Sequence, residues 1–134
     1  MRNIVFYFSK TDHLIVDGGI NKEEAVFIID TGANYTCIDL QRAQQLALPL
    51  ILSDEPAGGL GTTNMEKSET VIDRLYIGDV LLEKIPIAAI DLSNVIQVIK
   101  QLDGKQIDGV IGNDILKRFE AIIDYGKCSI TLHV

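Results

Sequence analysis

The sequence contains 134 residues, carries a formal net charge of −7 and is 47% hydrophobic, with a mean hydropathy of +0.21. This length suits one compact domain that buries a core without disulfides or a metal, so we expect a single domain over residues 1–134. The acidic charge argues against a nucleic-acid partner, because binding to a phosphate backbone needs a basic surface. We expect no membrane segment, since no apolar stretch reaches the roughly 18 residues of a membrane span.

The start of the chain favours a cytoplasmic or truncated product, and its two cysteines favour reduced thiols. The apolar run at residues 4–8 is short for a signal peptide and is not followed by a small-residue cleavage site. Cys37 and Cys128 each stand alone in an apolar or strand-like context, which is typical of reduced thiols rather than of a disulfide. We therefore expect a cytoplasmic protein with two free cysteines.

Short apolar or alternating runs, separated by turn residues, dominate the chain and predict a mostly β fold. Asp17-Gly18-Gly19 and Asn21-Lys22-Glu23-Glu24 predict two early turns. Pro86 predicts that its strand lies at an edge or contains a bulge. The predicted strands cover residues 4–9, 14–17, 25–30, 67–77, 80–90, 109–112, 121–124 and 129–134.

Three short helices are predicted between these strands. Asp39 is expected to cap a helix over residues 40–48, which the following proline ends. Apolar residues at helical spacing predict a second helix over residues 93–102. Asn113 is expected to cap the third helix, which extends to residue 119.

One acidic residue stands at the end of an apolar run, where a buried strand should break into a glycine turn. Phe27-Ile28-Ile29 precede Asp30, and Thr31-Gly32-Ala33 follow it. A strand end is rigid, and a carboxylate against an apolar floor is suited to acid or base catalysis. A shorter echo of strand, glycine turn and helix recurs at residues 110–114. Asp30 is therefore the candidate catalytic acid.

These motifs together resemble the single-domain, retropepsin-like aspartic proteases of clan AA. The resemblance rests on Asp30-Thr31-Gly32-Ala33 after two aliphatic residues, a glycine-rich segment roughly thirty positions on, and Val110-Ile111-Gly112-Asn113-Asp114-Ile115-Leu116. It spans most of the chain and implies an all-β, closed acid-protease barrel with one to three short helices. Two features depart from the family pattern: Asn34 replaces the usual Ser or Thr, and the segment 93–105 is longer than in a minimal retropepsin.

The resemblance also implies roles for individual residues. Asp30 would be the catalytic acid, Thr31 would hold its loop through hydrogen bonds across a dimer, and Gly32 would let the substrate approach the backbone. The polar, glycine-rich segment at about residues 54–66 would be the flap. The implied substrate-binding residues of the flap and the floor are Ala33, Gly58, Gly59, Leu60, Gly61, Val110 and Ile111.

This interpretation requires a dimer, because such peptide hydrolysis uses two carboxylates around one water and the chain has one Asp-Thr-Gly. A twofold axis beside Asp30 would supply the second carboxylate. The terminal strands, at residues 3–8 and 129–134, are the expected contact between protomers. We therefore expect a homodimeric aspartic endopeptidase that cleaves extended peptides with apolar side chains flanking the cut, without a metal or other cofactor.

Other titratable residues have simpler interpretations. Asp108 is a conceivable second acid in cis, but it lacks the Thr-Gly that follows Asp30 and is better interpreted as a turn residue. Asp114 is expected to stabilise a helix N-terminus, and Asp124 to sit in a hairpin. His13 and His133 fit no metal-ligand pattern.

Two other functions stay open on the sequence. The first is a catalytically inactive retropepsin-like module that binds peptides or dimerises, with Asp30 as a turn acid bonded to neighbouring amides. The second is a phosphate-loop fragment of the actin and sugar-kinase type, because a strand that ends in Asp-x-Gly also begins such loops. Against this, Gly58-Gly59-Leu60-Gly61 lacks the Lys-Ser/Thr of a P-loop, and the chain is short for a two-domain nucleotide-binding fold.

Overall fold

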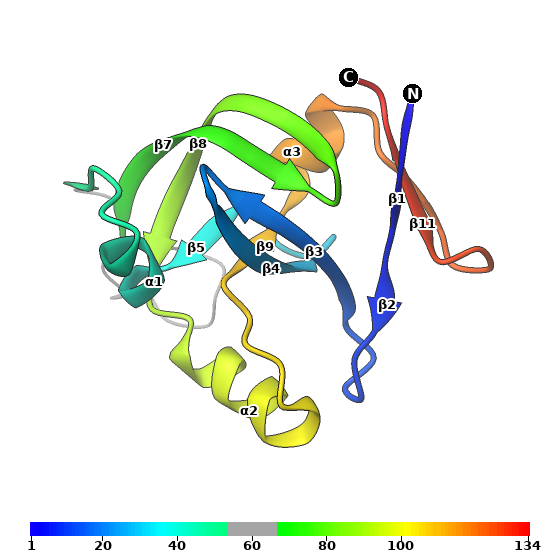
Figure 1. Ribbon diagram of the computed structural model, residues 1–134, viewed down its shortest axis with the longest axis horizontal. Coiled ribbons are helices and arrows are strands. Elements are labelled where there is room, and N and C mark those ends of the chain that lie inside the picture. The colour runs from blue at the N-terminus through cyan, green and yellow to red at the C-terminus, as the bar shows by residue number, and fades with distance from the viewer. Residues whose placement is uncertain (54–66) are drawn as a thin grey trace.

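The computed structural model describes residues 1–53 and 67–134 (Figure 1). The predicted flap at residues 54–66, with Gly58, Gly59, Leu60 and Gly61, lies outside the described residues. The helices are α1 (Leu40–Gln45), α2 (Ser93–Asp103) and α3 (Asn113–Arg118). The strands are β1 (Arg2–Val5), β2 (Tyr7–Phe8), β3 (Leu14–Ile20), β4 (Glu23–Ile29), β5 (Cys37–Asp39), β6 (Ile51–Leu52), β7 (Ser68–Ile77), β8 (Val80–Ile90), β9 (Gly109–Ile111), β10 (Ile122–Asp124) and β11 (Ser129–Leu132).

Six strands close into a barrel, as the sequence predicts. Their order is β3-β4-β9-β5-β8-β7, and the pairing of β7 with β3 closes the ring. The short strands β2 and β6 extend this sheet beside β3 and β7. Most neighbours are antiparallel, but β4 with β9 and β5 with β8 run parallel. Closure pairs the strand edges within the fold.

The glycines expected to form a first turn instead lie inside a strand. Gly18 and Gly19 belong to β3, where they pair with Ile77 and Tyr76 of β7. A Cβ atom on Gly18 would collide with the backbone oxygen of Tyr76. The glycine therefore lets the backbones of β3 and β7 approach closely enough to close the barrel. The turn predicted at residues 21–24 is shorter than expected, because β4 already begins at residue 23.

Pro86 lies in a strand with two neighbours, yet its local position suits proline. β8 is flanked by β5 and β7, so the strand as a whole is not an edge. Its pairing with β5 begins only at Ala88, whereas Pro86 pairs with Val71 of β7. At Pro86 the missing N–H group therefore costs no bond to β5.

The apolar residues form two clusters, one inside the barrel and one beneath α2. The first contains fully buried side chains such as Phe6, Ile38 and Ile72. The second joins Ile96 and Ile99 of α2 to side chains of β3, β4 and β9. α2 therefore covers one side of the barrel, as Figure 1 shows. This confirms the helix predicted at residues 93–102.

The helix ends agree in part with the predictions. Asp39 caps α1, since its side chain accepts a hydrogen bond from the Arg42 N–H group. The helix is shorter than expected and ends at Gln45. Asn113 is not the cap of α3, because Gly112 occupies that position and Asn113 is the first helical residue.

The terminal strands form a separate three-stranded sheet in the order β1-β11-β10. β1 pairs antiparallel with β11, which places both chain ends side by side at one end of the molecule (Figure 1). The hairpin between β10 and β11 confirms the predicted closing turn. Within the described ranges, no helix has the length and apolar character needed to cross a membrane.

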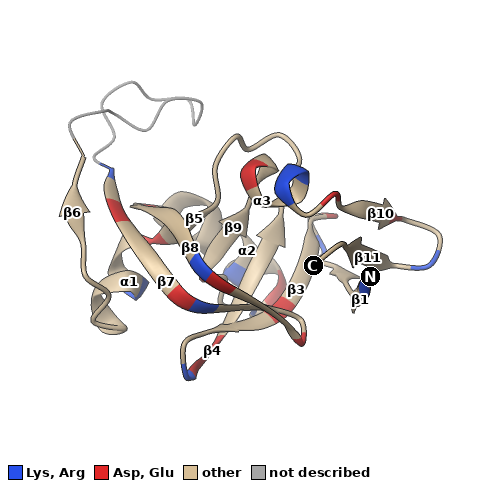
Figure 2. Ribbon diagram, turned by 90° about the horizontal axis from the view of Figure 1, so that it is seen from above, with Lys and Arg blue, Asp and Glu red and all other residues tan. Residues whose placement is uncertain are grey.

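Charges of both signs lie along the long hairpin of β7 and β8 (Figure 2). Glu69, Asp73 and Glu83 are interspersed there with Arg74 and Lys84. This mixture does not provide the basic surface that phosphate-backbone binding requires.

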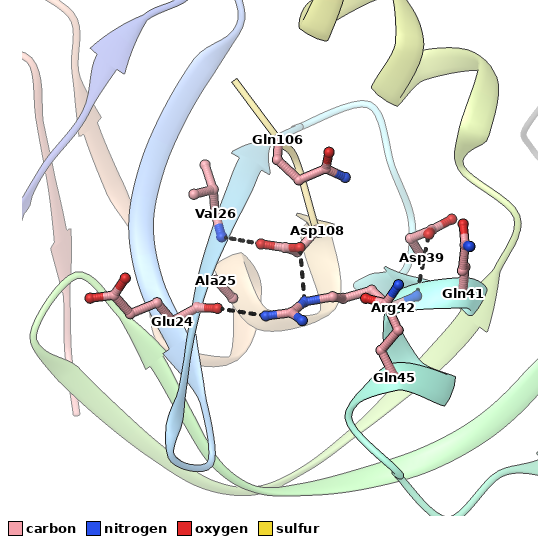
Figure 3. A pocket seen from close by; sticks show the side chains of 9 residues that line it. All are labelled: Glu24, Ala25, Val26, Asp39, Gln41, Arg42, Gln45, Gln106 and Asp108. Carbon is pink, nitrogen blue, oxygen red and sulfur yellow. Dashed lines mark hydrogen bonds and ion pairs between the residues drawn. The ribbon is translucent and has the colours of Figure 1, made fainter. Parts of the chain in front are cut away.

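Asp108, interpreted from the sequence as a turn residue, is a buried anchor. It is 5% exposed, and its Oδ1 lies 3.1 Å from Nε of Arg42, an ion pair without the alignment of a hydrogen bond (Figure 3). Its Oδ2 accepts the Val26 N–H at 2.8 Å, and its main-chain oxygen accepts the Asp39 N–H at 2.8 Å. Asp108 therefore joins α1, β4 and β5 at the start of β9.

Replacing Arg42 with Met should destabilise the fold by stranding this carboxylate. We expect the free energy of unfolding at pH 7 to fall by about 3 kcal/mol, because one partner of a buried pair is lost. Burial raises the pKa of Asp108 above its ordinary value of 3.8, against the opposing effects of the Val26 amide and Arg42. An acid whose pKa is raised in the folded state gains stability on protonation, so the loss should shrink as the pH falls towards 4.

Urea unfolding between pH 7 and pH 4 measures this effect. The control is Arg2→Met, which breaks an ion pair with Asp79 whose side chains are 54% and 80% exposed. The control should change the unfolding free energy by no more than about 0.5 kcal/mol. Equal losses in the two variants, or a loss that grows in acid, would contradict the anchoring role of Asp108.

Candidate active site

Asp30 stands exposed directly after β4, at the end of a buried strand, as the sequence predicts. β4 lies parallel to β9, and this register sets Ile29 beside Ile111. The Asp30 N–H group donates to the main-chain oxygen of Ile111 at 3.0 Å. The two segments that echo each other in the sequence are therefore neighbours in the barrel, and β9 fixes the backbone of the candidate acid.

The turn after Asp30 orients its carboxylate. The Gly32 N–H donates to Oδ1 of Asp30 at 2.8 Å, and the Ala33 N–H donates to the Asp30 main-chain oxygen at 3.2 Å. A carboxylate that accepts a backbone amide is held in one orientation while its second oxygen stays available. The same contact defines an Asx-turn, so this geometry suits both a catalytic acid and a turn acid.

The loop that contains Asp30 is fastened to the start of α3 by two residues that the sequence did not assign to the site. Thr36 donates to Oδ1 of Asp114 from its N–H group at 2.9 Å and from its hydroxyl at 2.7 Å. The Thr36 hydroxyl oxygen also accepts the Gly112 N–H at 3.0 Å. Asp114 thus does more than stabilise a helix end, since its carboxylate holds the far side of the Asp30 loop.

Gly112 is required at the crossing of these two segments. A Cβ atom there would lie 2.7 Å from the main-chain oxygen of Tyr35 and 2.8 Å from that of Ala33. Both neighbours are backbone atoms, so they cannot move aside as a flexible side chain would. The glycine of the second motif therefore lets the Asp30 loop pack directly against the start of α3.

Gly112→Ala should force the Asp30 loop away from α3. We expect a loss of about 3 kcal/mol in unfolding free energy, at the upper end of the range for overpacked sites. The matched control is Gly126→Ala, whose added Cβ would meet only Asp124 Oδ1 at 3.4 Å. Chemical denaturation of both variants checks this. A stable Gly112→Ala variant, no worse than the control, would show that the close packing described here is wrong.

A hollow of about 470 Å³ opens beside the candidate acid. Asp30 and Thr31 line it, together with a loop residue pair, Asp12 and His13. The remaining lining residues are Leu14, Ile28, Ile29, Ile123 and Tyr125. Sequence reasoning missed the contribution of His13, because its proximity to Asp30 depends on how β3 pairs with β4.

The predicted floor residues lie around this hollow rather than in its lining. Ala33 is half-buried, Val110 is 8% exposed, and Ile111 is fully buried in the barrel core. Val110 packs in the cluster beneath α2. Their contact with substrate stays a prediction, and their observed contribution is the apolar packing beneath the Asp30 loop.

Cys37 lies in the cluster beneath α2 and is a free thiol, as is Cys128. Burial, with a smaller contribution from the negative charge of Asp114, raises the pKa of Cys37 to about 12. A thiol with this pKa is almost entirely protonated at neutral pH and therefore a poor nucleophile. In the part of the chain that the structure describes, no three His, Cys, Asp or Glu side chains are grouped to hold a metal ion.

Alkylation should distinguish the two thiols. At pH 8 we expect iodoacetamide to modify Cys128 in the native protein and Cys37 only after denaturation, because Cys37 is 5% exposed and its thiolate is disfavoured. Peptide mass mapping gives the modified position, and a Cys128→Ser variant should show no rapidly reacting thiol. Rapid alkylation of Cys37 in the native protein would contradict its burial.

Comparison with known proteins agrees with this geometry. A family model described as "Aspartyl protease" matches residues 16–115, so the chain belongs to the aspartyl protease family. A retropepsin-like aspartic protease from Rickettsia conorii has a similar structure, with a TM-score of 0.66 and 18% sequence identity over 98% of this chain and 90% of that chain. The retroviral protease-like domain of Ddi1 from Leishmania major aligns over the same shares, with a TM-score of 0.58 and 15% identity. No curated protein matches the sequence.

These structural neighbours establish a retropepsin-like fold, and the family match covers the segment from β3 to the start of α3. Asp30-Thr31-Gly32 and Gly112 both fall inside that segment. The phosphate-loop interpretation is not compatible with this fold. The resemblance found in the sequence is confirmed for family and fold.

Proposed function

We propose that this protein is a homodimeric aspartic endopeptidase in which each protomer supplies one Asp30 to the catalytic dyad. The observation that carries the proposal is the presentation of Asp30. It stands exposed at a rigid strand end, its backbone is tied to Ile111, and one carboxylate oxygen is held by the Gly32 N–H group. Asp108, by contrast, is buried and paired with Arg42.

The chemistry follows from two carboxylates placed close together. They cannot both ionise easily, so the pair shares one proton and titrates as a unit. One Asp30 takes a proton from a water molecule as its oxygen attacks the scissile carbonyl carbon. Asp30 of the partner subunit, protonated, donates a hydrogen bond to the carbonyl oxygen. The first Asp30 then passes the proton that it took from water to the leaving nitrogen as the carbon–nitrogen bond breaks. In this proposal Thr31 stabilises the paired loops, and Gly32 lets the substrate backbone approach.

The terminal sheet lies where such a dimer would need a contact surface. Ile123 and Tyr125, from β10 and the turn after it, line the same hollow as Asp30. Phe8 and Tyr125 are 42% and 63% exposed, and their rings lie 5.7 Å apart. An exposed aromatic pair near the candidate acid suits an interface between protomers.

The pairing within the terminal sheet limits how two copies could join. β11 already has β1 on one side and β10 on the other, so its backbone edges are occupied within one chain. A second copy would therefore pair with the outer edge of β1 or β10, or pack against the face of the sheet. Val5 and Ile122 are 78% and 56% exposed on these outer strands.

The substrate in this proposal is an extended peptide with apolar residues beside the cut. Leu14, Ile28, Ile29 and Ile123 contribute apolar atoms to the hollow beside two carboxylates, although the first three of these side chains are largely buried. Such a lining favours apolar side chains and disfavours acidic ones. A cytoplasmic location belongs to the same proposal.

Asp30→Asn should abolish peptide cleavage while leaving the fold intact. We expect the cleavage rate on a diverse peptide pool to fall by about 10³-fold, within the range for loss of a general acid-base group. The control is Asp91→Asn, because the Asp91 carboxylate accepts the Ser93 N–H two residues on at 2.9 Å, just as Asp30 accepts that of Gly32. Mass spectrometry of the products and unfolding curves check both variants.

The mass in solution tests the assembly in the same experiment. Wild type and both variants should sediment at twice the chain mass of 14.8 kDa. Equal cleavage by the Asp30 and Asp91 variants would reduce Asp30 to a turn residue. Peptide binding without cleavage by the wild type would favour the inactive peptide-binding module, and cleavage by a monomer would exclude the shared dyad.

A further inference from the structure

His13 and Asp30 adjoin the last residue pair of the β3–β4 ladder. In the antiparallel pairing of these strands, Leu14 lies opposite Ile29. His13 directly precedes Leu14, and Asp30 directly follows Ile29. Both residues line the hollow of about 470 Å³. His13 therefore lines the same hollow as the candidate acid.

The loop before β3 holds this histidine in a defined position. The Ser9 N–H donates to the main-chain oxygen of His13 at 2.9 Å, and the His13 N–H donates to Oγ of Ser9 at 3.0 Å. Asp12 adopts a left-handed backbone conformation with φ of 61°, which aspartate tolerates better than most residues. The Lys10 N–H donates to both carboxylate oxygens of Asp103, at 3.1 and 2.9 Å, which ties this loop to α2.

A chain of side-chain hydrogen bonds fixes the imidazole ring itself. The hydroxyl oxygens of Ser9 and Thr11 are 2.7 Å apart, and the Thr11 hydroxyl is 2.6 Å from Nδ1 of His13. Ser9 is 7% exposed, so its hydroxyl proton needs an acceptor within the loop, and the Thr11 hydroxyl lies at the right distance. In the tautomer that carries its proton on Nε2, the Thr11 hydroxyl donates to Nδ1. This is the tautomer in which Nε2–H is available as a donor.

Within the described residues, Nε2 of His13 has no hydrogen-bond partner and no bond joins His13 to Asp30. The other titratable and charged groups near the ring are Asp12 on its own loop, Asp30 beyond β4, and Tyr125 from the turn after β10. Asp103 of α2 binds the Lys10 N–H group of the same loop and does not line the hollow. Two carboxylates beside a single fixed imidazole disfavour an acidic ligand and favour a neutral hydrogen-bond acceptor.

We propose that His13 is a substrate-binding residue whose Nε2–H donates a hydrogen bond to a main-chain carbonyl oxygen of the peptide next to the scissile bond. This inference rests on the proposed function and names a contact within the same site. An extended peptide presents a carbonyl group of one orientation at every second residue. A donor at a fixed distance from Asp30 sets the register of the peptide and so selects which amide meets the water.

The test pairs variants of His13 with changes in the peptide. Using a peptide that the wild type cleaves, each carbonyl group near the cut is replaced in turn by a methylene group. For the carbonyl that His13 contacts, this replacement should lower kcat/KM of the wild type about tenfold, which corresponds to one hydrogen bond. In His13→Leu the same replacement should have no further effect, because the donor is already absent.

Two further variants separate binding from structure. His13→Gln keeps a side-chain N–H donor and should recover part of the lost kcat/KM, mainly through KM. Thr11→Val removes the hydroxyl that orients Nδ1 and should weaken the coupling between His13 and the carbonyl, whereas Thr11→Ser should preserve it. Unfolding curves exclude a general loss of structure in these variants.

The outcomes distinguish this inference from the proposed function. If the wild type cleaves peptides and every carbonyl replacement costs the same with and without His13, the inference is overturned and the endopeptidase stands. If the wild type cleaves nothing, the endopeptidase proposal is overturned. Calorimetric binding of peptides with and without each carbonyl group then measures the coupling between His13 and that carbonyl group. Absence of both cleavage and binding overturns the two together.

Discussion

The parallel pairing of β4 with β9 is the contact on which the candidate site depends. It joins two segments about eighty residues apart in the sequence and gives the backbone of Asp30 a hydrogen bond to Ile111. The same pairing brings Gly112 beneath the loop that follows Asp30, where only a residue without Cβ fits. A short loop could not hold a carboxylate in place by itself, because the entropy of its free backbone would spread the acid over many positions.

Three of the acidic residues around this pairing anchor other segments, whereas Asp30 does not. Asp39 accepts the Leu92 and Arg42 amides, Asp108 accepts the Val26 amide and faces Arg42, and Asp114 accepts both polar groups of Thr36. Asp39 and Asp108 are buried, and backbone donors replace their lost hydration. Asp30 keeps one oxygen free at the surface. The anchors stabilise the strands from which the exposed acid projects.

In the proposed dimer, each protomer supplies one of the two catalytic carboxylates. The terminal sheet reaches the hollow beside Asp30 through Ile123 and Tyr125, so a contact between copies there would lie near the acid. On the other side, α2 packs through Ile96 and Ile99 onto the strands that flank Asp30 and is tied by Asp103 to the loop with His13. α2 thus supports the loop that carries His13.

The sequence by itself determined the family, the barrel class, most strands, the helix α2 and the candidate acid, because alternating apolar residues, glycine turns and Asp-Thr-Gly are local signals. Only the tertiary structure decided that Gly18 closes the barrel, that Asp108 is an anchor, and that Thr36 meets Asp114. These contacts join residues as much as 82 positions apart, and nothing in the neighbouring sequence marks either partner. The pairing of β3 with β4 likewise decided that His13 lines the same hollow as Asp30, since the two residues are 17 positions apart and meet only because Leu14 pairs with Ile29.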